Sequence, residues 1–71
     1  MTELEIRDYF TDEMFSWLRA VIGPGRIVDR YIATKPFNWE NCVWEFELGK
    51  AYNILKFKND ADSLVYRLRW Q

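Results

Sequence analysis

The chain has 71 residues, which is enough for one domain and no more, because burial per residue is small at this size. Its composition, 49% hydrophobic and 30% charged, excludes disorder over most of the length, since ample apolar surface is present to offset chain entropy. The net charge of −1 and the absence of His argue against a phosphate-neutralising protein and remove the commonest general base and metal ligand. We therefore expect a single domain, residues 1–71, with no cofactor and with nucleic acid an improbable partner.

The sequence also favours a cytoplasmic location in the producing or infected host cell. No apolar run approaches the roughly 18 residues that a membrane span needs, and the first five residues are acidic where a secretory signal is basic and then apolar. The lone Cys42 cannot form an internal disulfide, which is typical of proteins in a reducing compartment. No membrane partner is expected.

The first element is open between two interpretations. Leu4 and Ile6 alternate with charged side chains, as in a short strand, whereas Thr2 and Glu5 together form a helical capping box. We favour a separate element in residues 3–9 before the next helix.

The clearest helix is expected over residues 11–22. Thr11 is a good N-cap, and Asp12 and Glu13 lie in the first turn, where the helix dipole favours negative charge. Apolar residues then recur at helical spacing until the glycines of residues 23–25 end the helix. The stripe comprises Met14, Phe15, Leu18, Val21 and Ile22.

The rest of the chain has the patterns of strands. Residues 26–34 are rich in β-branched side chains, and three later segments alternate apolar and polar residues; these are residues 42–48, 51–58 and 64–70. Gly49-Lys50 fits a two-residue hairpin turn, and residues 59–62 fit a longer turn. The expected fold is α+β: one main N-terminal helix packed on a three- to four-stranded antiparallel sheet, a meander.

The two turns fix an expected register. The inward pairs would be Trp44–Leu55, Phe57–Leu64 and Leu55–Tyr66. The outward rows would be Val43–Lys56–Val65, Glu45–Ile54–Arg67 and Glu47–Tyr52–Arg69. Opposite charges flank an apolar or aromatic residue in two of these rows, which is typical of a solvated face and secondarily of a binding face.

No group of residues suggests catalysis. Cys42, Ser16 and Ser63 have no imidazole to activate them, and Asp60 and Asp62 lack the glycine and the terminal glutamate of a calcium loop. Glu45 and Glu47 are expected on the open sheet face, where nothing would raise a carboxyl pKa. The chain is expected to be neither an enzyme nor a metal protein.

Aromatic side chains are the strongest positive signal, at 18% of the residues. A domain this small cannot enclose so many rings, so some are expected to meet a partner. The loop at residues 35–41 supplies the best candidates, although it could equally cap an open end of the core. The candidate partner-binding residues are Phe37, Trp39, Glu40, Trp17, Tyr52, Glu45 and Glu47.

These features favour a non-enzymatic protein-binding module, an inhibitor or modulator that occludes a surface of a larger protein or nucleoprotein complex. In size, acidity and aromatic content the chain resembles the small accessory proteins of bacteriophages, anti-CRISPR inhibitors among them, although no motif is shared. One alternative is a homodimer or larger homo-oligomer that buries the excess rings between its copies.

Two further alternatives use the basic residues near the C-terminus. A sheet face carrying Lys56, Lys58, Arg67 and Arg69 would suit single-stranded nucleic acid. Residues 64–70 also resemble the closing strands of RelE-type ribonuclease toxins, a likeness limited to these seven residues.

Overall fold

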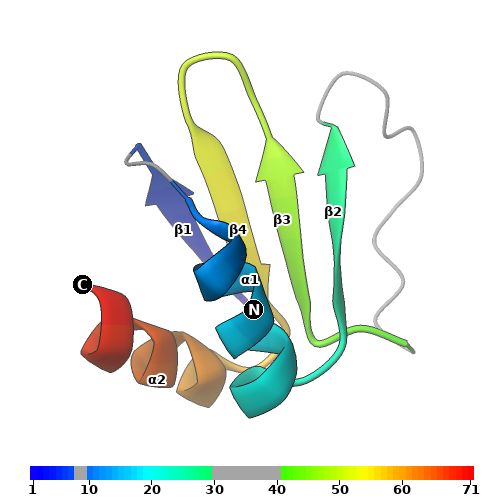
Figure 1. Cartoon of the computed structure of the whole chain (residues 1–71), viewed down its shortest axis with the longest axis vertical. Coiled ribbons are helices and arrows are strands. Elements are labelled where there is room, and N and C mark those ends of the chain that lie inside the picture. The colour runs from blue at the N-terminus through cyan, green and yellow to red at the C-terminus, as the bar shows by residue number, and fades with distance from the viewer. Residues whose placement is uncertain (8–9, 30–40) are drawn as a thin grey trace.

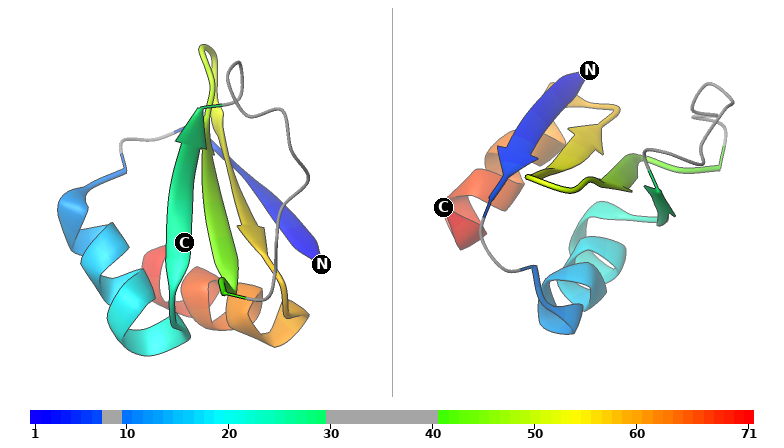
Figure 2. Two further views of the ribbon diagram at one scale, coloured as in Figure 1. Left: turned by 90° about the vertical axis from the view of Figure 1, so that its right-hand side faces the viewer. Right: turned by 90° about the horizontal axis from the view of Figure 1, so that it is seen from above.

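The computed structural model describes residues 1–7, 10–29 and 41–71. A four-stranded sheet carries the helices on one of its faces (Figures 1 and 2). In chain order the elements are β1 (Thr2–Ile6), α1 (Asp12–Trp17), the π-helical segment η1 (Leu18–Ile22), β2 (Gly25–Asp29), β3 (Trp44–Leu48), β4 (Asn53–Phe57) and α2 (Asp60–Trp70).

The expected antiparallel meander under one main N-terminal helix is wrong. The strand order is β1-β4-β3-β2; β1 and β3 both pair antiparallel with β4, whereas β2 pairs parallel with β3, so the sheet is mixed. The longest helix is the C-terminal α2, and the N-terminal α1 is short. The sequence pattern of each strand predicts which side chains face inward, but it does not predict whether β2 and β3 run parallel or antiparallel.

The segment expected to be the third meander strand, residues 64–70, lies within α2. Asn59 is the N-cap, and its carbonyl oxygen accepts the Asp62 N–H at 3.1 Å. Asp60 and Asp62 occupy the first turn and two arginines the last, which stabilises both ends of the helix dipole. The register expected between residues 51–58 and 64–70 is therefore wrong as well.

The helix expected over residues 11–22 is present as α1 followed without a break by η1. Thr11 is the N-cap, and its hydroxyl oxygen accepts the Met14 N–H at 3.3 Å. The Gly23 N–H donates to the Leu18 carbonyl oxygen at 2.9 Å, and Gly23 then takes a φ of 137°, a conformation that side chains disfavour. The glycine therefore ends the helix where the sequence indicates.

The first element, left open by the sequence, is the edge strand β1. Leu4 and Ile6 point into the core, while Glu3 and Glu5 are exposed. The strand predicted by the alternating pattern is therefore correct, and the helix predicted by the capping box is not. Leu4 lies opposite Leu55 of β4.

The β3–β4 pairing keeps the expected faces but shifts the expected register by two residues. Trp44 lies opposite Phe57, and Phe46 lies opposite Leu55. The loop is longer than a two-residue turn because the side-chain oxygen Oδ1 of Asn53 accepts the Gly49 N–H at 3.1 Å. A shift of two residues leaves every inward side chain on the inward face.

Aromatic rings fill the core between the sheet and the helices. Trp44, Phe46, Phe57 and Tyr66 are each at most 1% exposed. Phe10, just before α1, packs on Phe46 with ring centroids 4.4 Å apart. The rings from both helices therefore meet over β3 and β4.

The glycine turn also seats the largest core ring. The Trp44 indole nitrogen Nε1 donates to the Gly23 carbonyl oxygen at 2.8 Å, and the ring lies across the backbone of Gly25. A Cβ atom at Gly25 would lie 2.0 Å from the Trp44 ring. Residues 23–25 thus both end the helix and make room for Trp44.

Candidate functional site

An apolar groove opens between the start of α1 and the sheet. Its cavity measures about 580 Å³. The groove is lined by Arg7, Phe10, Phe15, Ile27, Phe46, Leu48 and Asn53. The groove therefore draws residues from the segment before α1, from α1 itself and from three strands.

The floor of the groove is a set of three rings in mutual contact. The Phe10 and Phe15 centroids lie 4.6 Å apart, and Phe15 meets Phe46 edge to face at 5.1 Å. The rim is aliphatic: Ile27 of β2 is 43% exposed and Leu48 of β3 is 41% exposed. The groove thus has a firm apolar base and two exposed side chains that a partner can cover.

Among the described residues that line the groove, Arg7 is the one cation. The Arg7 nitrogen Nε lies 3.0 Å from a carboxylate oxygen of Glu5, and the guanidinium group lies 5.3 Å from the centre of the Tyr52 ring. A guanidinium has five N–H donors, so the contact with Glu5 leaves donors that can reach an acceptor in the groove. Asn53 adds an amide to the same lining.

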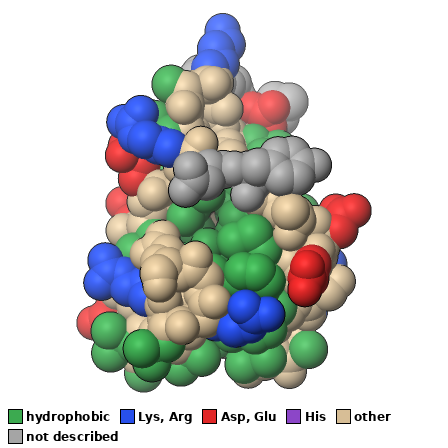
Figure 3. Space-filling view, turned by 60° about the vertical axis from the view of Figure 1, so that its left-hand side comes forward, with side chains coloured by type: hydrophobic (Ala, Val, Ile, Leu, Met, Phe, Trp, Pro, Cys, Tyr) green, Lys and Arg blue, Asp and Glu red, His purple; other side chains and the backbone are tan. Residues whose placement is uncertain are grey.

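A second apolar surface runs along the outer side of α2. Its residues are Ala61, Leu64, Val65 and Leu68, which we call the α2 stripe; all four are exposed, Leu68 by 88%. Hydrophobic side chains are visible across the lower part of the face in Figure 3, where Figure 1 places the helices. The opposite side of α2, with Ser63 and Tyr66, is buried. Both long sides of this helix are therefore adapted for contact.

The outward face of the sheet is covered with paired charges. Lys56 of β4 places Nζ 3.1 Å from Glu47 and 3.9 Å from Glu3, on its two neighbouring strands. An Arg26 guanidinium nitrogen lies 3.8 Å from a carboxylate oxygen of Glu45. This face is a charge network across all four strands, and the rows expected from the sequence are replaced by the row Arg26–Glu45–Lys56–Glu3.

Glu45 departs from the expected solvated carboxylate. Its side chain is nearly fully enclosed, with the residue 4% exposed. Burial raises the pKa of this carboxyl above its ordinary value, against the lowering effect of the Arg26 and Lys56 charges. The expectation that nothing raises a pKa on this face is therefore wrong for Glu45.

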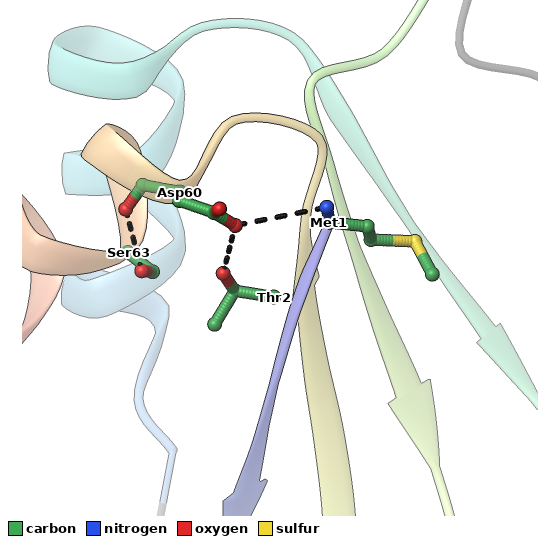
Figure 4. A network of polar contacts seen from close by, with 4 residues as sticks. All are labelled: Met1, Thr2, Asp60 and Ser63. Carbon is green, nitrogen blue, oxygen red and sulfur yellow. Dashed lines mark hydrogen bonds and ion pairs between the residues drawn. The ribbon is translucent and has the colours of Figure 1, made fainter.

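A tie between the N-terminal strand and α2 is drawn in Figure 4. The Thr2 hydroxyl donates to the Asp60 carboxylate, whose oxygen Oδ1 also lies 3.6 Å from the Met1 amino nitrogen. The hydrogen bond from Thr2 and the charge of the Met1 amino group both lower the pKa of the Asp60 carboxyl, and the hydrogen bond is the larger cause. The Ser63 hydroxyl donates to the Asp60 carbonyl oxygen at 2.7 Å, which closes the first turn of α2.

The candidate partner-binding residues predicted from the sequence lie in different parts of the molecule. Trp17 is half-buried between the helices, with its ring 6.0 Å from Trp70 and 6.2 Å from Tyr66. Tyr52 lies beside Arg7, which lines the groove. Glu45 and Glu47 belong to the charge network of the sheet, whereas Phe37, Trp39 and Glu40 lie outside the described residues.

Neither the groove nor the α2 stripe is evident from the sequence, and the reasons differ. Five of the seven groove residues are apolar and belong to ordinary elements or their ends, and the exposure of Ile27 and Leu48 becomes evident only once α1 is packed on the sheet. The stripe was hidden by the strand interpretation of residues 64–70. A signal for it was present, because Leu64 and Leu68 are four residues apart, as on one face of a helix.

The expected nucleic-acid face does not form. Lys56 lies on the outward sheet face, Lys58 follows β4, and Arg67 and Arg69 belong to α2. The residues that carry the likeness to RelE-type toxins are helical. The sheet face proposed for single-stranded nucleic acid and the strand proposed for the RelE-type likeness are therefore both absent from the described residues.

The described residues include neither a metal site nor a membrane-spanning helix. Within residues 1–7, 10–29 and 41–71, no group of three acidic or cysteine side chains is placed to hold a metal ion. None of the helices described there is long and apolar enough to cross a membrane.

No protein-family model matches the chain, and no curated protein or solved structure matches it either.

Proposed function

We propose that this chain is a non-enzymatic protein-binding module that receives an apolar segment of a larger partner in the groove. The observation that carries the proposal is the packed aromatic floor of Phe10, Phe15 and Phe46 beside two exposed aliphatic side chains. Interface hot spots are well-packed sites from which the bound partner excludes water, and the three packed rings would supply the base of such a site.

The chemistry of the groove defines its occupant. A leucine or aromatic side chain fits the apolar floor, and an acidic residue beside it would meet the guanidinium of Arg7. The amide of Asn53 can hydrogen-bond to the backbone of the bound segment. We therefore expect a short segment with an apolar anchor next to Asp or Glu.

The form of the groove favours a protein over a small molecule. Small-molecule sites enclose most of the ligand surface, whereas Ile27 and Leu48 of this groove are 43% and 41% exposed. By covering the segment that it binds, the module would act as an inhibitor or modulator of a larger protein or nucleoprotein complex. Occlusion of this kind needs no catalytic group.

The test is a displayed library of random peptides selected on the wild-type protein. The selected peptides are then measured on two variants with the same chemical change, Leu48→Gln in the groove and Leu68→Gln in the α2 stripe. We expect enriched peptides with a leucine or aromatic residue beside an acidic one, and an affinity about tenfold or more lower for Leu48→Gln. Binding to Leu68→Gln should be unchanged. Failure to enrich any peptide, or equal binding to both variants, would contradict the proposal.

A further inference from the structure

The α2 stripe is a narrow apolar band on a helix whose opposite side is already in the core. At about 100° per residue, its four members fall within an arc of about 100° centred opposite Ser63, Tyr66 and Trp70. Leu64 is 58% exposed and Val65 41%, beside the nearly bare Leu68. A stripe of this width is what one further helix covers.

Two pairs of opposite charges flank the stripe. The same rotation of about 100° per residue puts Asp60 and Arg67 along one side of it, and Asp62 and Arg69 along the other. On each side the acidic residue lies in the first turn and the basic residue in the last turn. Each flank therefore runs from negative to positive along the helix.

We propose that α2 pairs with α2 of a second copy of this chain, in an antiparallel arrangement about a two-fold axis between Leu64 and Val65. In this register Ala61 faces Leu68 of the other copy, and Leu64 faces Val65. A small side chain thus lies opposite the largest exposed one at both ends of the stripe. A two-fold contact repeats each of these pairs, so the surface is complementary to itself.

The flanking charges determine the direction of the pair. In the antiparallel arrangement, Asp62 of one copy meets Arg69 of the other on one flank, and Asp60 meets Arg67 on the other flank. In a parallel arrangement like charges would lie side by side at both helix ends, which is unfavourable. The charge pattern therefore selects the antiparallel pair.

The contacts that α2 makes within its own copy are compatible with this arrangement. The Asp60 oxygen Oδ1 contacts the Thr2 hydroxyl and the Met1 amino group (Figure 4). Asp60 is nevertheless exposed to solvent. The Arg69 guanidinium lies 4.2 Å from the Trp70 ring centre, a contact that orients it beside the helix. The buried side of α2, which packs on β4 and α1, does not take part.

The pairing is independent of the groove, which draws no residue from α2. The contact is short, since an 11-residue helix is only about 16 Å long. Interfaces of this size belong to the weak class, so we expect a dissociation constant of order 10–100 µM.

The deciding experiment is sedimentation equilibrium from low micromolar to millimolar concentration. The wild-type protein should shift from monomer to dimer and should not form larger species, because a two-fold contact is closed. Leu68→Gln should weaken the dimer about 10- to 100-fold, whereas Leu48→Gln should leave it unchanged. A wild-type protein that is monomeric throughout, or a dimer equally stable with Leu68→Gln, overturns the proposal.

A charge-reversal series tests the direction of the pair. Asp62→Lys should weaken the dimer about tenfold by facing Arg69 of the other copy, and adding Arg69→Glu should restore most of the loss. Thermal unfolding of each variant as a dilute monomer shows whether the fold is retained. If the double variant is no tighter than Asp62→Lys alone, the antiparallel register is wrong. Because the peptide-binding test uses the groove, failure of either proposal leaves the other standing.

Discussion

β3 and α2 differ in how they use their two sides. β3 buries Trp44 and Phe46 toward the helices and also Glu45 on the outward face, so that its centre is enclosed on both sides. α2 buries Tyr66 toward the sheet but exposes Leu68 almost completely. The side chains of β3 hold the fold together, whereas the outer side chains of α2 contribute little to it. Large apolar residues therefore have opposite roles in the two elements.

The largest effect is expected for Trp44→Ala. Removal of a fully buried tryptophan costs about 3–5 kcal/mol, and the hydrogen bond to the Gly23 carbonyl is lost with it. That cost is comparable to the whole stability of a small domain, so the variant should be largely unfolded at room temperature. Circular dichroism and urea unfolding measure the change. A loss below about 1 kcal/mol would mean that β3 is not the centre of the core.

A smaller loss is expected for Gly25→Ala. The added methyl group would lie 2.0 Å from the Trp44 ring, and overpacking of this kind costs about 1–3 kcal/mol. Gly49→Ala, in the β3–β4 loop, is the matched control, since φ at Gly49 is not positive. Adding Trp44→Leu to Gly25→Ala should remove much of the clash, so the two losses should not add. Simple additivity in urea unfolding would show that the ring does not need the glycine.

The elements that were predicted correctly depend on local signals. Thr11 begins the N-terminal helix and Gly23 ends it, and both are determined by neighbouring backbone groups. The inward faces of β3 and β4 were also correct, because side chains alternate whatever the register. The register itself was wrong because Asn53 caps the loop with its side chain, which the hairpin pattern Gly49-Lys50 does not reveal.

The helix α2 was missed because alternation over a short segment is ambiguous. Leu64, Tyr66, Leu68 and Trp70 are two residues apart, but Leu64–Leu68 and Tyr66–Trp70 are also the four-residue spacings of a helix. Asn59 and the acidic residues after it were the deciding signal, and they fit a turn equally well in isolation. The parallel pairing of β2 and β3 depends on contacts between distant segments, which local patterns do not contain.

The expectation of exposed rings failed in the described residues for a reason of packing. Trp17 and Trp70 contact each other edge to face, and both are at least half covered. The large apolar residues that remain exposed there are aliphatic or Met, as at Val21 and Leu64. Rings stack efficiently in a small core, so the aliphatic residues are displaced to the surface.

An effect of opposite sign is expected for Glu45→Gln. Burial raises the pKa of Glu45 in the folded protein, so the folded state favours the protonated carboxyl. The contribution of this group to the free energy of unfolding is fully present below the ordinary pKa of 4.5, and it is lost as the pH rises through the pKa of the folded state. The wild-type protein should therefore lose stability relative to Glu45→Gln between acid and neutral pH, as measured by urea unfolding. A relative gain with rising pH would mean that the pairing with Arg26 outweighs burial.

The smallest effect on stability is expected for Leu68→Gln in the dilute monomer. Leu68 is 88% exposed, so its replacement should change the free energy of unfolding by less than about 0.5 kcal/mol. Thermal unfolding at low micromolar concentration measures this monomer value. A loss above about 1 kcal/mol would show that the outer side of α2 contributes to the fold, contrary to the contrast with β3.

The pairing of β1 with β4 has a consequence for how the chain is made. Thr2 lies opposite Phe57, so β1 has no partner strand until β4 has also been synthesised. Until then Leu4 and Ile6 stay exposed to water and to other nascent chains. Contacts between such distant residues also slow folding relative to that of a helical bundle of the same length. This domain should therefore complete its sheet only after β4 has emerged from the ribosome.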